Sequence, residues 1–195
     1  MTDWPRVTSI LKDFGLLGVD LPWFEPKHRR RGRYVDHWCN EIGRRSDGPD
    51  EEWYARKSGD PAQGDEIEHE ICRPFIDAYR QALAETNATM THCALEVRNT
   101  ACRYVGHIDQ VWDLFGSALI DIKTGGESDW HKYQLGLYQP AVVETLKIFP
   151  RRYNLYLTYE NGKGKYRLFE RKDRRDIAEA IILAQAWHIV HGRNA

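Results

Sequence analysis

The segment GHIDQVWDLFGSALIDIKTG, residues 106–125, constrains the fold more than any other part of the chain. In its second half, Asp121 and Lys123 alternate with isoleucines. A period of two is typical of a half-buried strand, with charged side chains on one face and apolar ones on the other. The segment therefore predicts a strand that carries an aspartate and a lysine on its polar face.

The first half of this segment predicts the partner strand. By the same alternation, Ile108 and Trp112 fall on one face and Asp109 falls on the opposite face. A three-residue loop over 114–116, with glycine in its left-handed position, places Asp109 directly opposite Asp121. Like charges opposite each other destabilise a sheet, so this hairpin requires a compensating cation.

Length and composition set wider limits. The 195 residues predict a single domain over 1–195, large enough for a substantial core. No apolar run is long enough to span a bilayer, and the start MTDWPRVTSIL lacks a signal-peptide pattern, so we expect a cytoplasmic protein without a membrane partner. The four cysteines form no CxxC pair, which favours reduced thiols over a zinc or iron–sulfur site.

The net charge of −1 hides an uneven distribution of charged residues. Basic residues cluster at 27–33, 151–152 and 171–175, and acidic residues cluster at 46–52 and 64–70. A basic cluster is either a solvated surface or a site of phosphate contact, and both alternatives stay open here.

The rest of the chain predicts helices and further strands around this hairpin. Apolar periodicity indicates helices over about 8–14, 31–44, 67–83, 129–146 and 174–191, and strands over 93–99, 102–113, 117–124, 151–160 and 165–171. Thr8 or Ser9 is expected to cap the first helix, and Pro140 is expected to kink or restart the fourth. The segment at about 45–65 is rich in Gly, Pro and Asp and predicts a polar loop or flap.

Other polar residues fall near the hairpin. A lone D-x-K is more often a surface ion pair worth under about 1 kcal/mol, so a specific signal needs neighbours. Glu96 opens the preceding strand. Gln134 and Tyr138 lie at i and i+4 on one face of the next helix.

With these residues in place, the chain resembles the PD-(D/E)XK nuclease superfamily, in particular its RecB-like and phage-exonuclease branch. The matching motifs are Gly106-x-x-Asp109, Asp121-Ile-Lys123-Thr-Gly and Gln134-x-x-x-Tyr138, with RRGRYVDHWCNE and VTSILKDFGL upstream. The resemblance implies an α/β (α+β) fold with a restriction-endonuclease-like core, in which helices flank a central mixed β-sheet.

The resemblance also implies a set of catalytic residues. Asp109 and Asp121 would bind Mg²⁺, for which Mn²⁺ can substitute, Lys123 would orient or activate the attacking water, and Gln134 and Tyr138 would hold nucleic acid near the scissile phosphate. The chemistry agrees, because a divalent ion stabilises charge on the phosphate and lowers the pKa of a bound water. Removing one charge by Asp121→Asn is then expected to stabilise the metal-free protein.

The helix predicted over about 31–44 corresponds to the family's first helix but departs from that helix's pattern, G-x-x-V-H. Here Val35 is followed by Asp36, and His37 comes one residue later. Neighbouring helical residues point about 100° apart, so one of the two is expected to face the metal, with Asp36 slightly favoured and His37 left open. Glu96 is either a further metal ligand or a surface acid. No cysteine follows the Gln134 motif, so no iron–sulfur cluster is expected.

The function implied is that of a magnesium-dependent DNA nuclease, with an exonuclease of phage or recombination and repair type as the first hypothesis. Two alternatives stay open: a catalytically impaired nucleic-acid-binding or assembly protein, and an endonuclease on the same scaffold. The expected partners are a DNA substrate and a recombination or replication protein. The sequence predicts no oligomeric state.

Overall fold

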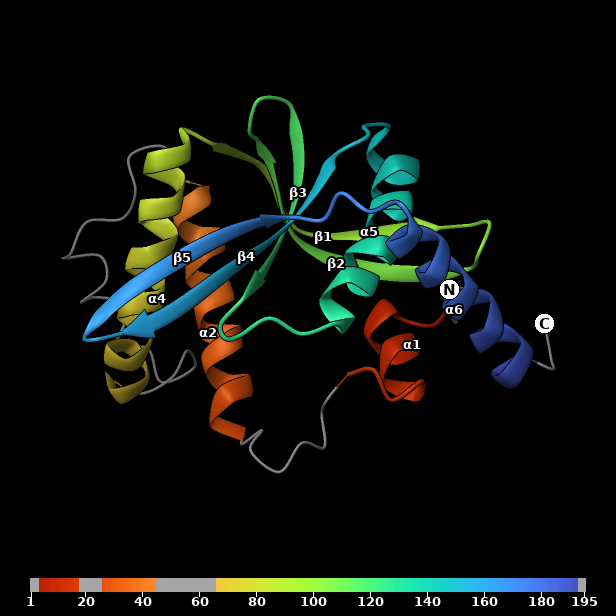
Figure 1. The fold of residues 1–195 in the computed structure, drawn as a ribbon, viewed down its shortest axis with the longest axis horizontal. Coiled ribbons are helices and arrows are strands. Elements are labelled where there is room, and N and C mark those ends of the chain that lie inside the picture. Colours follow the sequence, from red (N-terminus) through yellow and green to blue (C-terminus); the bar gives the residue numbers. More distant parts are fainter. Residues whose placement is uncertain (1–3, 18–25, 45–65, 193–195) are drawn as a thin grey trace.

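A five-stranded mixed sheet forms the centre of the molecule (Figure 1). The computed structural model describes residues 4–17, 26–44 and 66–192, so the loop predicted at 45–65 lies outside the described residues. The strands are β1 (Thr89–Asn99), β2 (Tyr104–Asp113), β3 (Ser117–Lys123), β4 (Arg151–Glu160) and β5 (Lys163–Glu170), in that spatial order. Among these described strands, β3 and β4 pair in parallel and the other neighbours are antiparallel, which confirms the predicted α/β fold with a mixed sheet.

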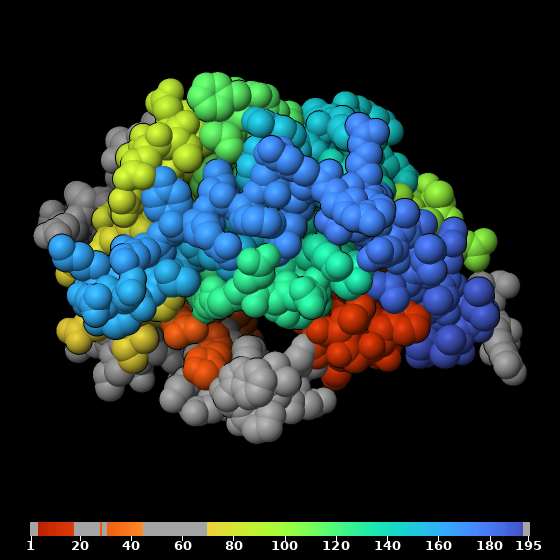
Figure 2. All heavy atoms as spheres, in the orientation of Figure 1, coloured from red at the N-terminus to blue at the C-terminus, as the bar shows by residue number. Residues whose placement is uncertain are grey.

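Helices cover both faces of this sheet. They are α1 (Val7–Asp13), α2 (Pro26–Gly43), α4 (Glu66–Thr86), α5 (Trp130–Leu146) and α6 (Arg175–His191). Apolar side chains of α2 and α4 form one core with the sheet, and those of α1, α5 and α6 form a second core on the opposite face. Figure 2 shows the outer surface in the same orientation. In the described part of the chain, no helix has both the length and the apolar character needed to cross a membrane.

Three local predictions differ from the structure. The first helix begins at Val7 with Arg6 as its N-cap, so neither Thr8 nor Ser9 caps it. Helix α2 begins at Pro26, five residues earlier than predicted, because proline has no N–H to leave unpaired in the first turn. Pro140 lies inside α5, which continues past it to Leu146, so of the two expected outcomes the helix does not restart there.

The β2–β3 hairpin has the predicted register. Gln110 pairs with Ile120 and Asp113 with Ser117, so the same register continued by one residue sets Asp109 opposite Asp121. The loop is the predicted one over 114–116, with φ of +104° at its glycine.

Strand β2 changes face along its length. Ile108 packs in the core beneath α1, α5 and α6, whereas Trp112 packs in the core beneath α2 and α4, so the prediction that they share a face is wrong. In the adjacent strand, Ala94 has a φ of +48°, next to Leu95, which pairs with Ile108. A left-handed residue interrupts the regular alternation of a strand. The change of face falls at Asp109, which therefore lies between the two helical layers.

Gly164 sets how closely β5 approaches α4, and its replacement by alanine is expected to destabilise the fold. A Cβ at this position would lie 1.7 Å from the backbone oxygen of Pro74. Neither backbone can yield cheaply, so we expect the free energy of unfolding to fall by about 3 kcal/mol or more. Urea denaturation measures this effect, with Gly126→Ala as the control because a Cβ there meets no atom within 4 Å. Equal midpoints for the two variants would contradict this close packing of β5 against α4.

Candidate active site

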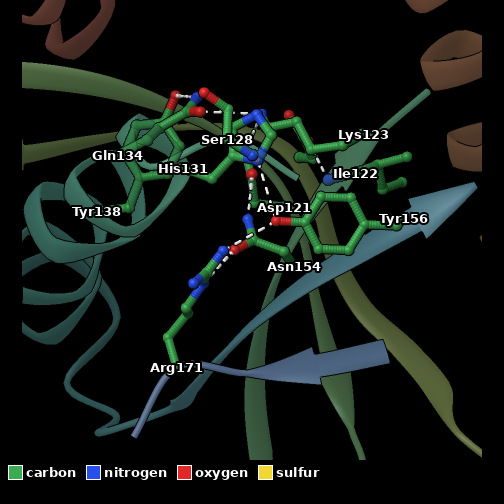
Figure 3. A network of polar contacts seen from close by, with 11 residues as sticks. Asp121, Ile122, Lys123, Ser128, His131, Gln134, Tyr138, Asn154, Tyr156 and Arg171 are labelled. Carbon is green, nitrogen blue, oxygen red and sulfur yellow. Dashed lines mark hydrogen bonds and ion pairs between the residues drawn. The ribbon is translucent and has the colours of Figure 1, made fainter. Parts of the chain in front are cut away.

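A buried aspartate lies at the centre of the polar contacts in Figure 3. Asp121 on β3 is fully buried, and its carboxylate accepts two hydrogen bonds. Lys123 Nζ donates to Oδ1 at 2.8 Å, and Asn154 Nδ2 donates to Oδ2 at 2.7 Å. Burial raises the pKa of Asp121, and the contacts with Lys123 and Asn154 oppose that rise. The ammonium group of Lys123 is thus the compensating cation that the hairpin requires.

Helix α5 supplies the next members of this chain of contacts. Lys123 Nζ also donates to Gln134 Oε1 at 2.9 Å, and Gln134 Nε2 donates to the hydroxyl of Tyr138 at 2.9 Å. The same ammonium lies 5.0 Å from the ring centroid of Trp130. The structure therefore brings together four of the residues that the sequence predicted as catalytic, Asp121, Lys123, Gln134 and Tyr138.

Gly106 allows α5 to lie this close to the sheet. A Cβ at position 106 would come within 2.8 Å of the ring of Tyr138. The motif Gly106-x-x-Asp109 is therefore in direct contact with the motif Gln134-x-x-x-Tyr138. Gly106 lies under α5, and Asp109, three residues later, lies at the point where β2 changes face.

Asp109 binds to the neighbouring strand through its side chain. Its Oδ2 accepts a hydrogen bond from the backbone N–H of Ile122 at 2.7 Å. Burial, followed by the carboxylates of Asp36 and Asp121, raises the pKa of Asp109 well above its usual range. These electrostatic effects indicate that three carboxylates lie in one region of low dielectric.

Asp36 brings α2 into this region. It is half-buried, and Asn40 Nδ2 donates to its Oδ1 at 3.4 Å. Burial raises the pKa of Asp36, while Lys123 and the hydrogen bond from Asn40 lower it. Asn40 Oδ1 in turn accepts a hydrogen bond from the buried Gln110 at 2.8 Å, which links this turn of α2 to β2.

Two predicted metal ligands lie away from this group. His37 is exposed, and its ring makes an edge contact with Trp38 at 5.5 Å between centroids. Glu96 is exposed on β1, where it forms an ion pair with Arg98 at 2.7 Å. We therefore leave His37 and Glu96 out of the candidate site. Of the two alternatives on α2, Asp36 is the residue whose carboxylate interacts with those of Asp109 and Asp121.

The donor atoms suit a hard divalent cation. Among the described residues, no three His, Cys, Asp or Glu side chains are already grouped as a metal site. Magnesium, however, is usually bound through one or two carboxylates and keeps several waters. Asp109 and Asp121 supply two such carboxylates, and their mutual repulsion would be relieved by a bound cation. Asp36 is the third carboxylate of the same region.

A second layer of residues was not predicted from the sequence. Asn154 is fully buried on β4, where the parallel register sets it beside Asp121. Arg171 Nε donates to Asn154 Oδ1 at 2.8 Å, which fixes the amide so that its NH₂ group points at the carboxylate. The signal in the sequence is a polar residue inside the apolar strand RRYNLYL.

This second layer continues to a buried histidine. Arg171 donates to the hydroxyl of Tyr156 at 2.9 Å, and that hydroxyl lies 3.0 Å from His131 Nδ1. Burial, with Lys123 and Arg171 nearby, lowers the pKa of His131 to about 3, so the ring is neutral at neutral pH. The backbone N–H of Ser128 donates to Nδ1, which makes Nδ1 an acceptor and Tyr156 the donor to it.

Comparison with solved structures supports the fold. A candidate exonuclease from Eubacterium rectale superposes with a TM-score of 0.62 at 12% identity, over 100% of this chain and 84% of that one. LHK-Exo in complex with dAMP gives 0.42 at 13% identity, over 97% and 88%, and SSO0001 gives 0.36 at 16% identity, over 97% and 85%. No family model matches the sequence, and no curated protein matches it. The chain therefore shares the fold of the first of these structures.

Proposed function

We propose that this protein is a magnesium-dependent DNA nuclease that hydrolyses phosphodiester bonds. The observation that carries the proposal is the buried Asp121 carboxylate, held 2.8 Å from Lys123 Nζ with Asp109 on the neighbouring strand. The shared fold with a candidate exonuclease supports it. Phosphodiester hydrolysis needs charge stabilisation and an activated water, and this set of residues suits both requirements.

Asp109 and Asp121 would hold the metal ion, with Asp36 beside them. When bound, Mg²⁺ or Mn²⁺ stabilises negative charge on the phosphate and lowers the pKa of a water. Lys123 Nζ, held between Asp121 and Gln134, orients that water or a phosphate oxygen.

Gln134 and Tyr138 position the lysine and the substrate. Gln134 Nε2 donates to the oxygen of the buried Tyr138, which keeps the amide oxygen turned toward Lys123, and this pair would hold the nucleic acid near the scissile phosphate. Burial raises the pKa of Tyr138, so the phenol stays protonated at neutral pH.

We propose further that cleavage starts from DNA ends, as in an exonuclease of phage or recombination and repair type. The test uses linear DNA labelled at either end and a covalently closed circle, each with Mg²⁺, Mn²⁺ or EDTA. We expect mononucleotides from the linear DNA and no cleavage of the circle. Cleavage of the circle would indicate an endonuclease, and DNA binding without cleavage would indicate the catalytically impaired binding protein.

Asn154→Ala is expected to lower the cleavage rate or the affinity for Mg²⁺ by about 10–100-fold. Its amide orients the Asp121 carboxylate, and loss of such a partner of a metal ligand typically has an effect of that size. Cleavage rates measured across a Mg²⁺ titration test this, with Gln81→Ala on the exposed side of α4 as the control. Equal titration curves for both variants would show that Asn154 does not orient Asp121.

A further inference from the structure

The face of the sheet that carries Asp121 continues onto β4 and β5, and α5 covers only part of β4 on this face among the described residues. Helix α4 packs against the opposite face of these two strands, whereas α5 lies mainly over β1 and β2 and also contacts β4, where His131 meets Tyr156. In Figures 1 and 2 the β4–β5 hairpin lies at the front of the molecule, with α4 behind it. The described residues thus leave a sheet surface open beside the candidate active site.

Cations line this open surface at regular spacing. Lys163, Lys165 and Arg167 alternate along β5, and the register pairs Lys165 and Arg167 with Thr158 and Tyr156, on the same face of the sheet. Alternate residues of a strand are about 7 Å apart. Lys165 and Arg167 have side chains that are 59% and 53% exposed. With Arg171, which follows the strand, they form what we call the β5 cationic row.

The row leads into the candidate active site. Arg171 is only 12% exposed, and it donates to Asn154, which in turn donates to Asp121. The innermost cation of the row is therefore one side chain away from the buried aspartate. The outermost, Lys163, lies at the tip of the hairpin.

Carboxylates balance only part of this charge. Glu127 forms ion pairs with both Arg167, at 2.9 Å, and Arg171, at 2.8 Å, and Glu160 pairs with Lys165. Within the described part of the chain, the four cations of the row thus pair with two carboxylates. Ion pairs at exposed sites are weak, so a phosphate group can compete for these side chains.

Aromatic rings hold the guanidinium groups against the sheet. Arg167 lies 4.7 Å from the ring centroid of Tyr156, and Arg171 lies 4.5 Å from that of Phe169. Because these contacts already order the long side chains, the side chains lose less conformational freedom when they bind a ligand. A row of ordered cations on an open surface suits an extended polyanion.

We infer that the β5 cationic row binds the phosphate backbone of the DNA substrate and directs the strand toward Asp121. The inference rests on the proposed function, because it names the path that the substrate follows to the same site. Lysine and arginine side chains that contact phosphates release condensed counterions, which makes the affinity dependent on salt.

The test compares two triple variants with the same change in charge. Lys163→Gln, Lys165→Gln and Arg167→Gln alter the row but leave Arg171 in place. Lys12→Gln, Arg98→Gln and Arg175→Gln remove three exposed cations on α1, β1 and α6. DNA affinity is measured by fluorescence anisotropy in EDTA over a range of salt concentrations, after circular dichroism has shown that both variants are folded.

We expect the row variant to bind DNA more weakly and to reduce the slope of log K against log salt by about 2–3, since each phosphate contact on duplex DNA contributes about 0.9. The control variant should keep the wild-type slope. A row variant with the wild-type slope, in a protein that binds and cleaves DNA, would overturn the row alone. A wild-type protein that does not bind DNA would overturn the row and the proposed function together.

Discussion

Lys123→Met is expected to reduce the rate of DNA cleavage by at least about 100-fold. Methionine keeps the apolar stem but removes the ammonium that contacts Asp121 and Gln134. Loss of one positioned donor from a catalytic site typically reduces the rate by two to three orders of magnitude. The measurement is the single-turnover cleavage rate at saturating Mg²⁺. A rate close to that of wild type would remove Lys123 from the mechanism.

The same variant should also change stability in a metal-dependent way. Without Lys123, Asp121 becomes a buried carboxylate that has lost its cation, which is strongly destabilising. The melting temperature in EDTA should therefore fall, and the increase on adding Mg²⁺ should be at least as large as in wild type. Lys12→Met on the exposed side of α1 is the control and should change neither quantity.

Asp109→Asn is expected to stabilise the metal-free protein and to abolish the effect of Mg²⁺ on stability. The asparagine oxygen can still accept from Ile122 N–H, while the charge that Asp36 and Asp121 repel is removed. For a Kd of about 1 mM and about 10 mM Mg²⁺, wild type should gain about 1.4 kcal/mol. That gain corresponds to a rise of about 3–6 °C in melting temperature, which a thermal scan resolves.

Asp121→Asn is the informative comparison. The sequence predicts that this change stabilises the metal-free protein, but both carboxylate oxygens accept from donors, Lys123 and Asn154. An amide at position 121 would face one of these donors with its own NH₂ group, and Asn154 cannot turn over because its oxygen accepts from Arg171. We therefore expect no gain in stability from Asp121→Asn.

For Asp109→Asn, a Mg²⁺-induced rise in melting temperature equal to that of wild type would show that the ion binds elsewhere.

The hairpin could be predicted because its information is local. The alternation around Asp121, the three-residue loop and Gly116 together determine which residues lie opposite each other. The helix that carries Gln134 and Tyr138 follows within a few residues, so its contact with Lys123 could also be expected from the sequence.

The unpredicted part depends on contacts between distant segments. Asn154 lies beside Asp121 through a parallel pairing that spans α5, and neither strand encodes that register by itself. The change of face in β2 accompanies a left-handed residue, Ala94, in another strand. The choice between Asp36 and His37 depends on how α2 is rotated against the sheet, which the pattern of α2 alone did not determine.

The rate at which nucleotides leave end-labelled linear DNA, measured in Mg²⁺ and in EDTA, tests the proposed metal-dependent nuclease site most directly. It is measured for wild type and for Asp109→Asn, which is expected to be at least as stable. We expect cleavage only by wild type in Mg²⁺. Cleavage by wild type in EDTA, or cleavage by Asp109→Asn at the wild-type rate, would contradict a metal-dependent nuclease site at Asp109, Asp121 and Lys123.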